Sequence, residues 1–107
     1  MVSRGEVWWY ERPHREPRPQ LILTRQAAIA VLHEVLAVPA TRTVRGIPTE
    51  VALDELDGMP SSCCLTLDNV ALVRPALCTR RITTLSPQRM REVCLALAAA
   101  TGFSLTA

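Results

Sequence analysis

The 107-residue sequence has no lysine, and all twelve of its basic side chains are arginines. The formal net charge is only +2, so net charge alone does not mark a nucleic-acid-binding protein. No apolar run reaches the roughly 18–20 residues that a membrane-spanning helix requires. The N-terminus carries Glu6 before any apolar stretch, which is not typical of a signal peptide, so we expect a cytoplasmic protein. A hydrophobic content of 49% argues against disorder, and the length predicts one domain over residues 1–107.

The sequence also lacks a metal-binding pattern. Zinc sites use pairs such as Cys-x2-Cys, with further His or Cys ligands at similar spacing. Here Cys63 and Cys64 are adjacent, so on a strand their side chains face opposite ways, and neither His14 nor His33 lies at a metal-ligand spacing. We therefore predict no metal and no cofactor. The four cysteines are expected to be free, buried thiols, because disulfides are rare in a reducing compartment.

Short apolar runs separated by turn signals predict a mainly β fold with flanking helices. We expect strands at Glu6–Tyr10, Gln20–Leu23, Glu34–Pro39, Thr49–Leu53, Cys63–Leu67 and Val70–Val73. Alanines favour one or two helical turns within Gln26–Leu32. The last element, Pro87–Thr101, is predicted to be a helix, because Ser86 is a good N-cap and Gly102 suits the C-terminal cap. This order favours a small, strongly bent sheet or barrel with a helical flank.

Two polar stretches that follow apolar strands carry five of the twelve arginines. The stretches are Glu11–Arg18 and Thr41–Gly46, and their arginines are Arg12, Arg15, Arg18, Arg42 and Arg45. Guanidinium groups match the geometry of phosphates and stack on bases. A hydroxyl such as that of Thr41, at the end of a buried strand, would be held on a rigid element. Judged by residue type alone, such charged loops are more often solvated surface than binding sites.

The order of several segments changes that interpretation. The chain opens with Arg4-Gly5-Glu6-Val7-Trp8-Trp9 and continues with Arg18-Pro19-Gln20-Leu21-Ile22-Leu23, Val38-Pro39-Ala40-Thr41, Ile47-Pro48-Thr49-Glu50-Val51 and Ser61-Ser62-Cys63-Cys64-Leu65-Thr66-Leu67-Asp68-Asn69. Over essentially the whole chain this resembles the MazF/PemK family of toxin endoribonucleases from bacterial toxin–antitoxin systems. The resemblance implies a small SH3-like barrel with a C-terminal helix, usually a homodimer. It also implies growth arrest through metal-independent, sequence-specific cleavage of single-stranded RNA.

The same resemblance assigns roles to individual residues. The family's catalytic Arg and Thr fall on Arg18 and Thr41, and a supporting serine falls approximately on Ser62. The ribose 2′-hydroxyl would attack the adjacent phosphate and leave 2′,3′-cyclic phosphate and 5′-hydroxyl ends. The neighbouring side chains would form an RNA-binding track: Arg12, Arg15, Arg42, Thr43 and Arg45. An acidic segment of a cognate antitoxin is expected to cover this basic groove.

Which group accepts the proton of the 2′-hydroxyl stays open at this point. The resemblance suggests that Arg18 takes part in proton transfer, but arginine is normally protonated and is a weak base. Glu16 and His14 are alternatives, and histidine exchanges protons near neutral pH. The loop Glu11–Arg18 is shorter than in many relatives, which should change the cleavage sequence. Gln20 stands where the family usually has an apolar residue.

Two other functions use the same kind of barrel. A gyrase-inhibiting toxin of the CcdB type acts through a tail ending in Trp-Gly-Ile, whereas this chain ends in Phe103-Ser104-Leu105-Thr106-Ala107. A passive RNA-binding barrel would keep the basic loops without needing Thr41. Trp8 and Trp9 should face opposite sides of a strand, and for the one outside the core we favour packing against a protein surface over stacking on RNA.

Overall fold

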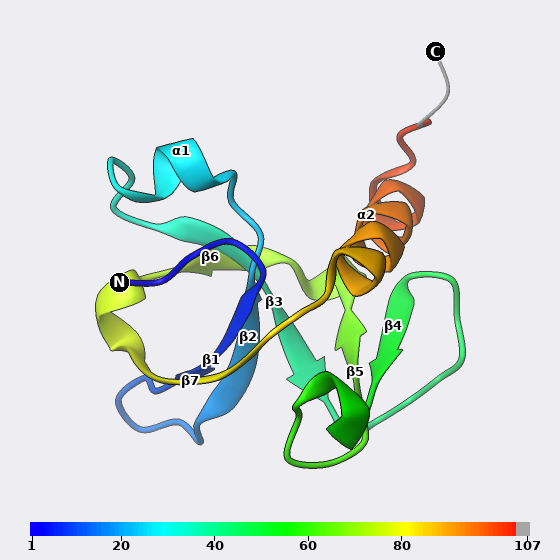
Figure 1. Ribbon diagram of the computed structural model, residues 1–107, viewed down its shortest axis with the longest axis horizontal. Coiled ribbons are helices and arrows are strands. Elements are labelled where there is room, and N and C mark those ends of the chain that lie inside the picture. The colour runs from blue at the N-terminus through cyan, green and yellow to red at the C-terminus, as the bar shows by residue number, and fades with distance from the viewer. Residues whose placement is uncertain (105–107) are drawn as a thin grey trace.

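Seven antiparallel strands and two helices make up the structure, a computed structural model that describes residues 1–104 (Figure 1). In chain order the elements are β1 (Glu6–Tyr10), β2 (Arg18–Ile22), α1 (Gln26–Ile29), β3 (Val35–Thr41), β4 (Glu50–Leu53), β5 (Cys63–Thr66), β6 (Ala71–Val73), β7 (Cys78–Thr84) and α2 (Pro87–Thr101). Short 3-10 turns lie at Glu55–Asp57, Leu67–Asn69 and Pro75–Leu77. The predicted mainly β fold with a C-terminal helix is confirmed.

The long strand β3 holds the two halves of the sheet together. The strand order is β4–β5–β3–β2–β1–β7, and β6 pairs with β3 as well. Along β3, Val35–Ala37 pair with β6, whereas Ala40 and Thr41 pair with β5. Figure 1 shows β4 and β5 turned away from β1, β2 and β7, with α2 beside them. The sheet is therefore strongly bent and barrel-like, and in the described part of the chain β4 and β7 stay unpaired with each other.

Both faces of the central strands are buried. On β2, Leu21 packs in a large cluster that includes Val93 of α2, and its neighbour Ile22 packs in a smaller cluster that includes Ile29 of α1. Successive side chains of a strand point to opposite faces, so each residue contributes to a different cluster. Burial on both sides explains why β3 has a nearly continuous apolar sequence and why Leu21 and Ile22 of β2 are both apolar.

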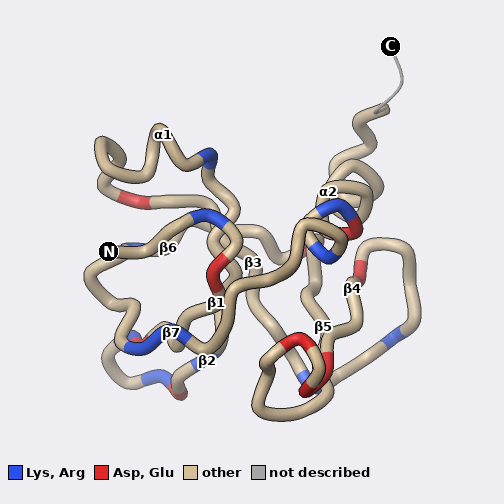
Figure 2. Tube along the Cα trace, viewed as in Figure 1, with Lys and Arg blue, Asp and Glu red and all other residues tan. Residues whose placement is uncertain are grey.

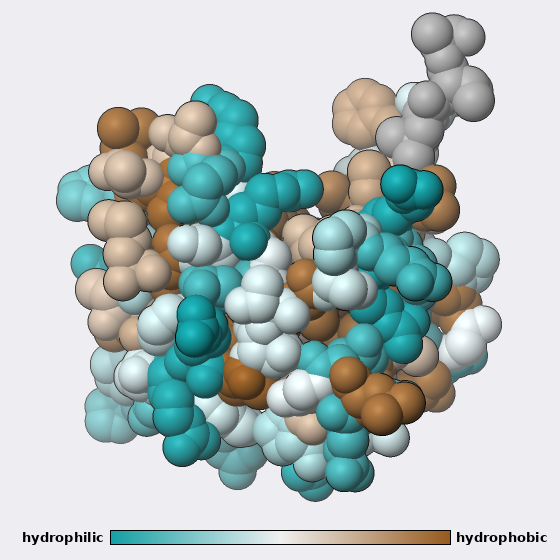
Figure 3. All heavy atoms as spheres, in the orientation of Figure 1, coloured by the Kyte–Doolittle hydropathy of each residue, from teal (hydrophilic) through white to brown (hydrophobic). Residues whose placement is uncertain are grey.

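The caps of α2 are those predicted from the sequence. The Oγ of Ser86 accepts a hydrogen bond from the backbone N–H of Arg89 at 3.1 Å, and Pro87 is the first helical residue. Gly102 ends the helix in the left-handed conformation, with φ of +75°. Within residues 1–104, no helix is both long and apolar enough to cross a membrane. In the orientation of Figure 3, apolar side chains gather around α1, where Val31 and Leu32 are exposed.

The strand β7 (Cys78–Thr84) was missing from the sequence-based prediction. It pairs only with β1 and lies at the edge of the sheet, so most of its side chains are exposed or half-buried. Because neither face is packed as in β2, its sequence lacks a run of apolar residues and resembles a loop. The helix α1 is a single turn that ends at Ile29, within the one or two turns predicted.

The boundaries of β2 and β3 differ from the prediction at the two predicted catalytic residues. Arg18 begins β2 instead of ending a loop, and Thr41 is the last residue of β3, which continues beyond Pro39. Pro19 is tolerated within β2 because it pairs with β1 alone: the pairing between β2 and β3 begins only at Gln20. The thiol prediction also needs correction: Cys63 and Cys64 are buried, but Cys78 is half-buried and Cys94 is exposed.

Gly58 provides a test of the packing between a turn and the edge strand. A Cβ added at Gly58 would lie 2.3 Å from Oγ1 of Thr83, and φ there is +90°. Gly102 has a similar φ of +75° but open space around it. We expect Gly58→Ala to lower the free energy of unfolding by about 1–3 kcal/mol more than Gly102→Ala, because overpacking adds to backbone strain. Urea unfolding of both variants measures this, and equal losses would contradict it.

Candidate active site

The predicted catalytic pair lies on two neighbouring strands. In the antiparallel register of β2 and β3, Gln20 is opposite Pro39 and Leu21 is opposite Val38. Arg18 is two residues before Gln20 and Thr41 is two residues after Pro39, beyond the paired part of these two strands, and both residues line the same cavity. Two residues that are 23 positions apart in the sequence thus meet at one end of the sheet.

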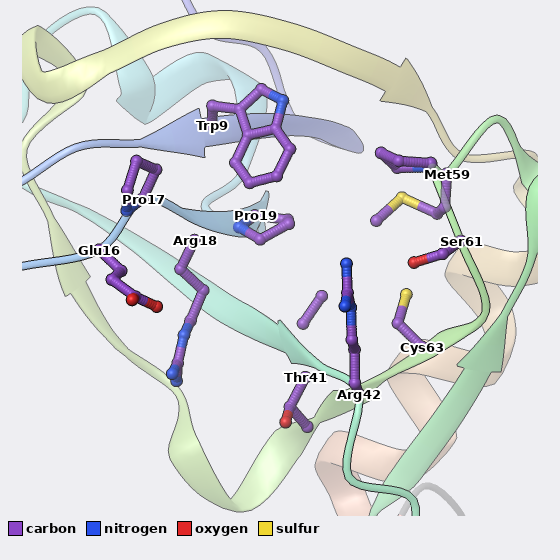
Figure 4. A pocket seen from close by; sticks show the side chains of 12 residues that line it. Trp9, Glu16, Pro17, Arg18, Pro19, Thr41, Arg42, Met59, Ser61 and Cys63 are labelled. Atoms are coloured by element: carbon purple, nitrogen blue, oxygen red, sulfur yellow. The ribbon is translucent and has the colours of Figure 1, made fainter.

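Arg18 and Thr41 line a cavity of about 390 Å³ between the two halves of the sheet (Figure 4). Glu16 and Arg42 contribute charged groups to its wall, and Trp9 lies across it on β1. The remaining lining residues come from the end of the β1–β2 loop, from β2 and β3, and from the segment that leads into β5: Pro17, Pro19, Ala40, Met59, Pro60, Ser61 and Cys63. An open cavity with two guanidinium groups, a carboxylate and a hydroxyl has the groups needed to bind a phosphodiester.

A smaller cavity of about 130 Å³ lies on the other side of the same pair. Arg18 and Thr41 line it together with Thr43, Arg45 and Asn69, among others. The pair is therefore the border shared by two neighbouring cavities. An extended chain could cross this border with its backbone over Arg18 and Thr41 and a residue in each cavity.

The hydroxyl of Thr41 is oriented by the backbone. Its Oγ1 accepts a hydrogen bond from the N–H of Thr43 at 3.2 Å. A hydroxyl that already accepts a bond retains its own proton for donation. Thr41 is half-buried at the end of β3, where β5 also pairs with it through Cys64. The O–H of Thr41 is thus available to a ligand in either cavity.

The loop after Thr41 is anchored by Glu50 at the start of β4. Its Oε1 accepts hydrogen bonds from the backbone N–H of Arg45 at 3.0 Å and of Gly46 at 2.9 Å. The thiol of Cys64 lies 3.4 Å from the carbonyl oxygen of Thr43 and donates to it. Burial opposes ionisation of Glu50, but these backbone N–H groups outweigh it and keep the pKa of Glu50 below its ordinary value. The anchor is therefore in place at neutral pH.

Removing this anchor should affect both loop order and activity. We expect Glu50→Ala to speed hydrogen exchange at the amides of Arg45 and Gly46 and to lower the rate of catalysis by up to about 10²-fold, because small misplacements of binding groups are costly. Glu55→Ala, at an exposed position in the turn after β4, is the control. Unchanged exchange at the two amides would show that Glu50 does not order the loop.

Several predicted RNA-binding residues lie outside these cavities. Arg12 stacks near Tyr10, with its guanidinium carbon 5.8 Å from the ring centroid, and Arg15 is exposed on the β1–β2 loop. His14 is exposed as well, with a positive φ of 60°, and lines neither cavity. Ser62 is exposed, whereas its neighbour Ser61 lines the larger cavity. Of the basic track, the structure thus brings Arg42 and Arg45, with Thr43, to the catalytic pair.

The sequence analysis missed Trp9 and Cys63 as cavity residues. The sequence left open which of Trp8 and Trp9 lies outside the core; Trp9 is half-buried and faces the site (Figure 4). Cys63 lies in the wall, where burial raises the pKa of its thiol, so it is neutral at pH 7. Strand alternation places Trp9 opposite to Trp8, but only the fold shows which of the two faces the cavity. In the described part of the chain, no group of three or more His, Cys, Asp and Glu side chains is arranged to hold a metal ion.

The chain is similar over most of its length to known endoribonucleases. Probable endoribonuclease MazF5 of Mycobacterium tuberculosis is 40% identical over 98 residues, which cover 91% of this chain and 90% of that protein. Probable endoribonuclease MazF2 of the same species is 39% identical over 102 residues, covering 94% and 99%. These names support the prediction that the chain is an endoribonuclease.

Solved structures agree with the sequence matches. An endoribonuclease in complex with its cognate antitoxin, from a mycobacterial species, superimposes with a TM-score of 0.87 at 27% identity, covering 97% of this chain and 98% of that chain. The M. tuberculosis toxin MazF-mt6 has a TM-score of 0.84, also at 27% identity, covering 92% and 98%. A family model described as PemK-like, MazF-like toxin of type II toxin–antitoxin system matches residues 3–101. The chain therefore belongs to the PemK-like, MazF-like family of toxins, as its sequence motifs predicted.

Proposed function

We propose that this chain is the toxin of a type II toxin–antitoxin pair and cleaves single-stranded RNA in the cytoplasm without a metal ion. The products are a 2′,3′-cyclic phosphate and a 5′-hydroxyl, and a single toxin domain over residues 1–107 carries the activity. The observation that supports this most is that Arg18 and Thr41 together line two neighbouring cavities.

The residue types at this border suit attack on phosphorus. The 2′-oxygen forms a bond to phosphorus, the bond to the 5′-oxygen breaks, and negative charge builds on the non-bridging oxygens. The guanidinium of Arg18 and the hydroxyl of Thr41 stabilise that charge, as fixed donors do in other active sites. The attacking hydroxyl loses a proton to a base, and the departing 5′-oxygen gains one from water in the open cavity.

Glu16 is the base that the geometry favours. It lines the same cavity as Arg18 and Thr41, whereas His14 lies on the exposed loop outside it. A general base must lie within hydrogen-bond reach of the proton that it removes. In this mechanism Arg18 acts on the phosphate oxygens. A Glu16→Gln variant with a much lower rate, beside a His14→Gln variant with the wild-type rate, would support this assignment; the reverse would refute it.

An antitoxin is the proposed regulator of this site. The structural relative described above is bound to its cognate antitoxin, and the arginines of this groove would attract an acidic segment that folds on binding. We further propose that the toxin is a homodimer, which light scattering of the free protein tests. If the antitoxin from the neighbouring reading frame left RNA cleavage unchanged, its proposed position over the groove would be wrong.

The decisive experiment is cleavage of mixed RNA by the purified protein in EDTA. We expect fragments with 5′-hydroxyl and 2′,3′-cyclic phosphate ends, detected by ligation methods that distinguish these ends from 5′-phosphates. The chelator removes divalent metal ions, so cleavage in its presence identifies the metal-independent reaction. Intact RNA would overturn the nuclease function and favour a toxin that acts by binding alone.

A further inference from the structure

A third cavity continues from the active site along β1 and β7. It has a volume of about 800 Å³ and is lined by Trp9, Glu11, Glu16, Pro17, Thr79 and Arg80. Trp9, Glu16 and Pro17 also line the cavity that contains Arg18 and Thr41. In Figure 4, Trp9 lies above Pro19, and Pro17 lies to its left, above Glu16. A ligand that leaves the catalytic pair past Trp9 therefore enters this third cavity, called the Trp9 groove below.

Two Trp–Arg pairs lie side by side on β1 and β7, and only one is satisfied internally. Trp8 is opposite Arg81, and Trp9 is opposite Arg80. In the first pair, Trp8 Nε1 donates to Glu6 at 3.0 Å and Arg81 Nη1 forms an ion pair with Glu6 at 3.1 Å. Within residues 1–104, the side chain of Arg80 makes no hydrogen bond or ion pair, and it is exposed in the Trp9 groove. In the pair that faces the groove, the guanidinium of Arg80 is therefore available to bind a ligand.

The charges of the groove favour a neutral group over a phosphate. Two carboxylates, Glu11 and Glu16, face a single guanidinium, that of Arg80. One oxygen of Glu11 accepts a bond from Thr79 Oγ1 at 2.6 Å, which leaves its other oxygen as an acceptor. A phosphate would be repelled by both carboxylates. A base that carries donors on one edge and acceptors on another can satisfy both kinds of side chain.

We propose that the Trp9 groove is a subsite for an unpaired guanine next to the cleaved phosphate, which stacks on the indole of Trp9. Guanine alone among the four bases presents an N1–H and an N2 amino group side by side, as two donors for one carboxylate, and O6 with N7 as two acceptors for an arginine. Stacking on an aromatic side chain is the usual way in which single-stranded RNA is held. This inference rests on the proposed function, since it names part of the RNA that the same site cleaves.

Binding of uncleavable RNA tests the subsite separately from catalysis. A short 2′-O-methyl RNA lacks the attacking hydroxyl, so its affinity reports binding alone. We expect oligonucleotides with guanine at one position beside the cleavage site to bind about tenfold more tightly than those with inosine, which lacks the N2 amino group. Arg80→Ala and Trp9→Ala should reduce the affinity for the guanine oligonucleotide about tenfold. The matched control is Arg81→Ala, which removes the same charge from the other face of β7 and should keep the preference.

Cleavage of a randomised RNA pool, read by sequencing of the 5′-hydroxyl ends, gives the second measurement. Guanine should be enriched at a single flanking position by the wild type and by Arg81→Ala, and this enrichment should vanish in Arg80→Ala. A wild type that shows no guanine preference in either assay would overturn the subsite. So would a Trp9→Ala variant whose only defect is a changed oligomeric state, because the groove would then be a protein interface. Guanine-dependent binding without any cleavage would overturn the nuclease function and leave the subsite standing.

Discussion

Replacing Arg18 with alanine is expected to lower kcat for RNA cleavage by about 10²- to 10³-fold, the usual cost of removing one donor to a developing oxyanion. Arg18 lines both cavities at the border with Thr41, so its guanidinium can contact the phosphate while the flanking nucleotides occupy the cavities. Single-turnover cleavage of one oligonucleotide at saturating enzyme measures this rate separately from binding. Arg25→Ala is the control, because it removes an equal charge from an exposed position before α1.

A lysine at the same position separates the effect of charge from the effect of guanidinium geometry. Arg18→Lys retains the positive charge but loses the planar fork that binds two oxygens at once. We expect it to restore affinity for RNA while kcat stays at least about tenfold below wild type, because a point charge stabilises the transition state less well. If Arg18→Ala kept the wild-type rate under saturating enzyme, Arg18 would be a binding residue and the proposed mechanism would be wrong.

Replacing Thr41 with valine is expected to reduce kcat by about 10²-fold at little cost in stability. Valine has nearly the shape of threonine and suits the end of a strand, so the change removes the hydroxyl without emptying the site. The Oγ1 of Thr41 also orders the next turn by accepting the N–H of Thr43, at 3.2 Å. Circular dichroism and thermal unfolding should show a folded variant, and single-turnover cleavage should show the loss.

Serine at position 41 distinguishes a catalytic hydroxyl from a structural one. Thr41→Ser keeps the Oγ and both of its hydrogen-bonding functions but lacks the methyl group. It should retain cleavage within about tenfold of wild type, since only χ1 restriction is lost. Equal rates for the serine and valine variants would mean that the hydroxyl does not act on the phosphate.

The strands of the core were predictable because their residues carry local signals. β1 lies at Glu6–Tyr10 as predicted, and α2 begins and ends as predicted because Ser86 and Gly102 are caps that act within one turn. β7 was missed because an edge strand buries few side chains and needs few apolar residues. The exposure of Cys94 was also not predicted, because the rule that free cysteines are buried ignores which face of a helix they occupy.

In the candidate site, too, some residues were predictable from the sequence and others were not. Arg18 and Thr41 were identified by their motifs, but Ser61 and Trp9 were not recognised as cavity residues, since no motif states which side of a strand faces the groove. The competing bases Glu16 and His14 are two residues apart in one loop, and sequence reasoning left both open. The fold separates them, because the loop directs Glu16 into the cavity wall and leaves His14 exposed.

By itself, the sequence determined the class of fold, the family and the two residues at the centre of the proposed chemistry. Those features depend on residue type and order, which local rules and motif resemblance can detect. Only the tertiary structure decided that Arg18 and Thr41 line the same two cavities, that Glu50 anchors the loop beside them, and that Arg80 faces a groove while Arg81 is paired. These relations depend on strand register and on which face each strand buries, and both are set by contacts between distant segments of the chain.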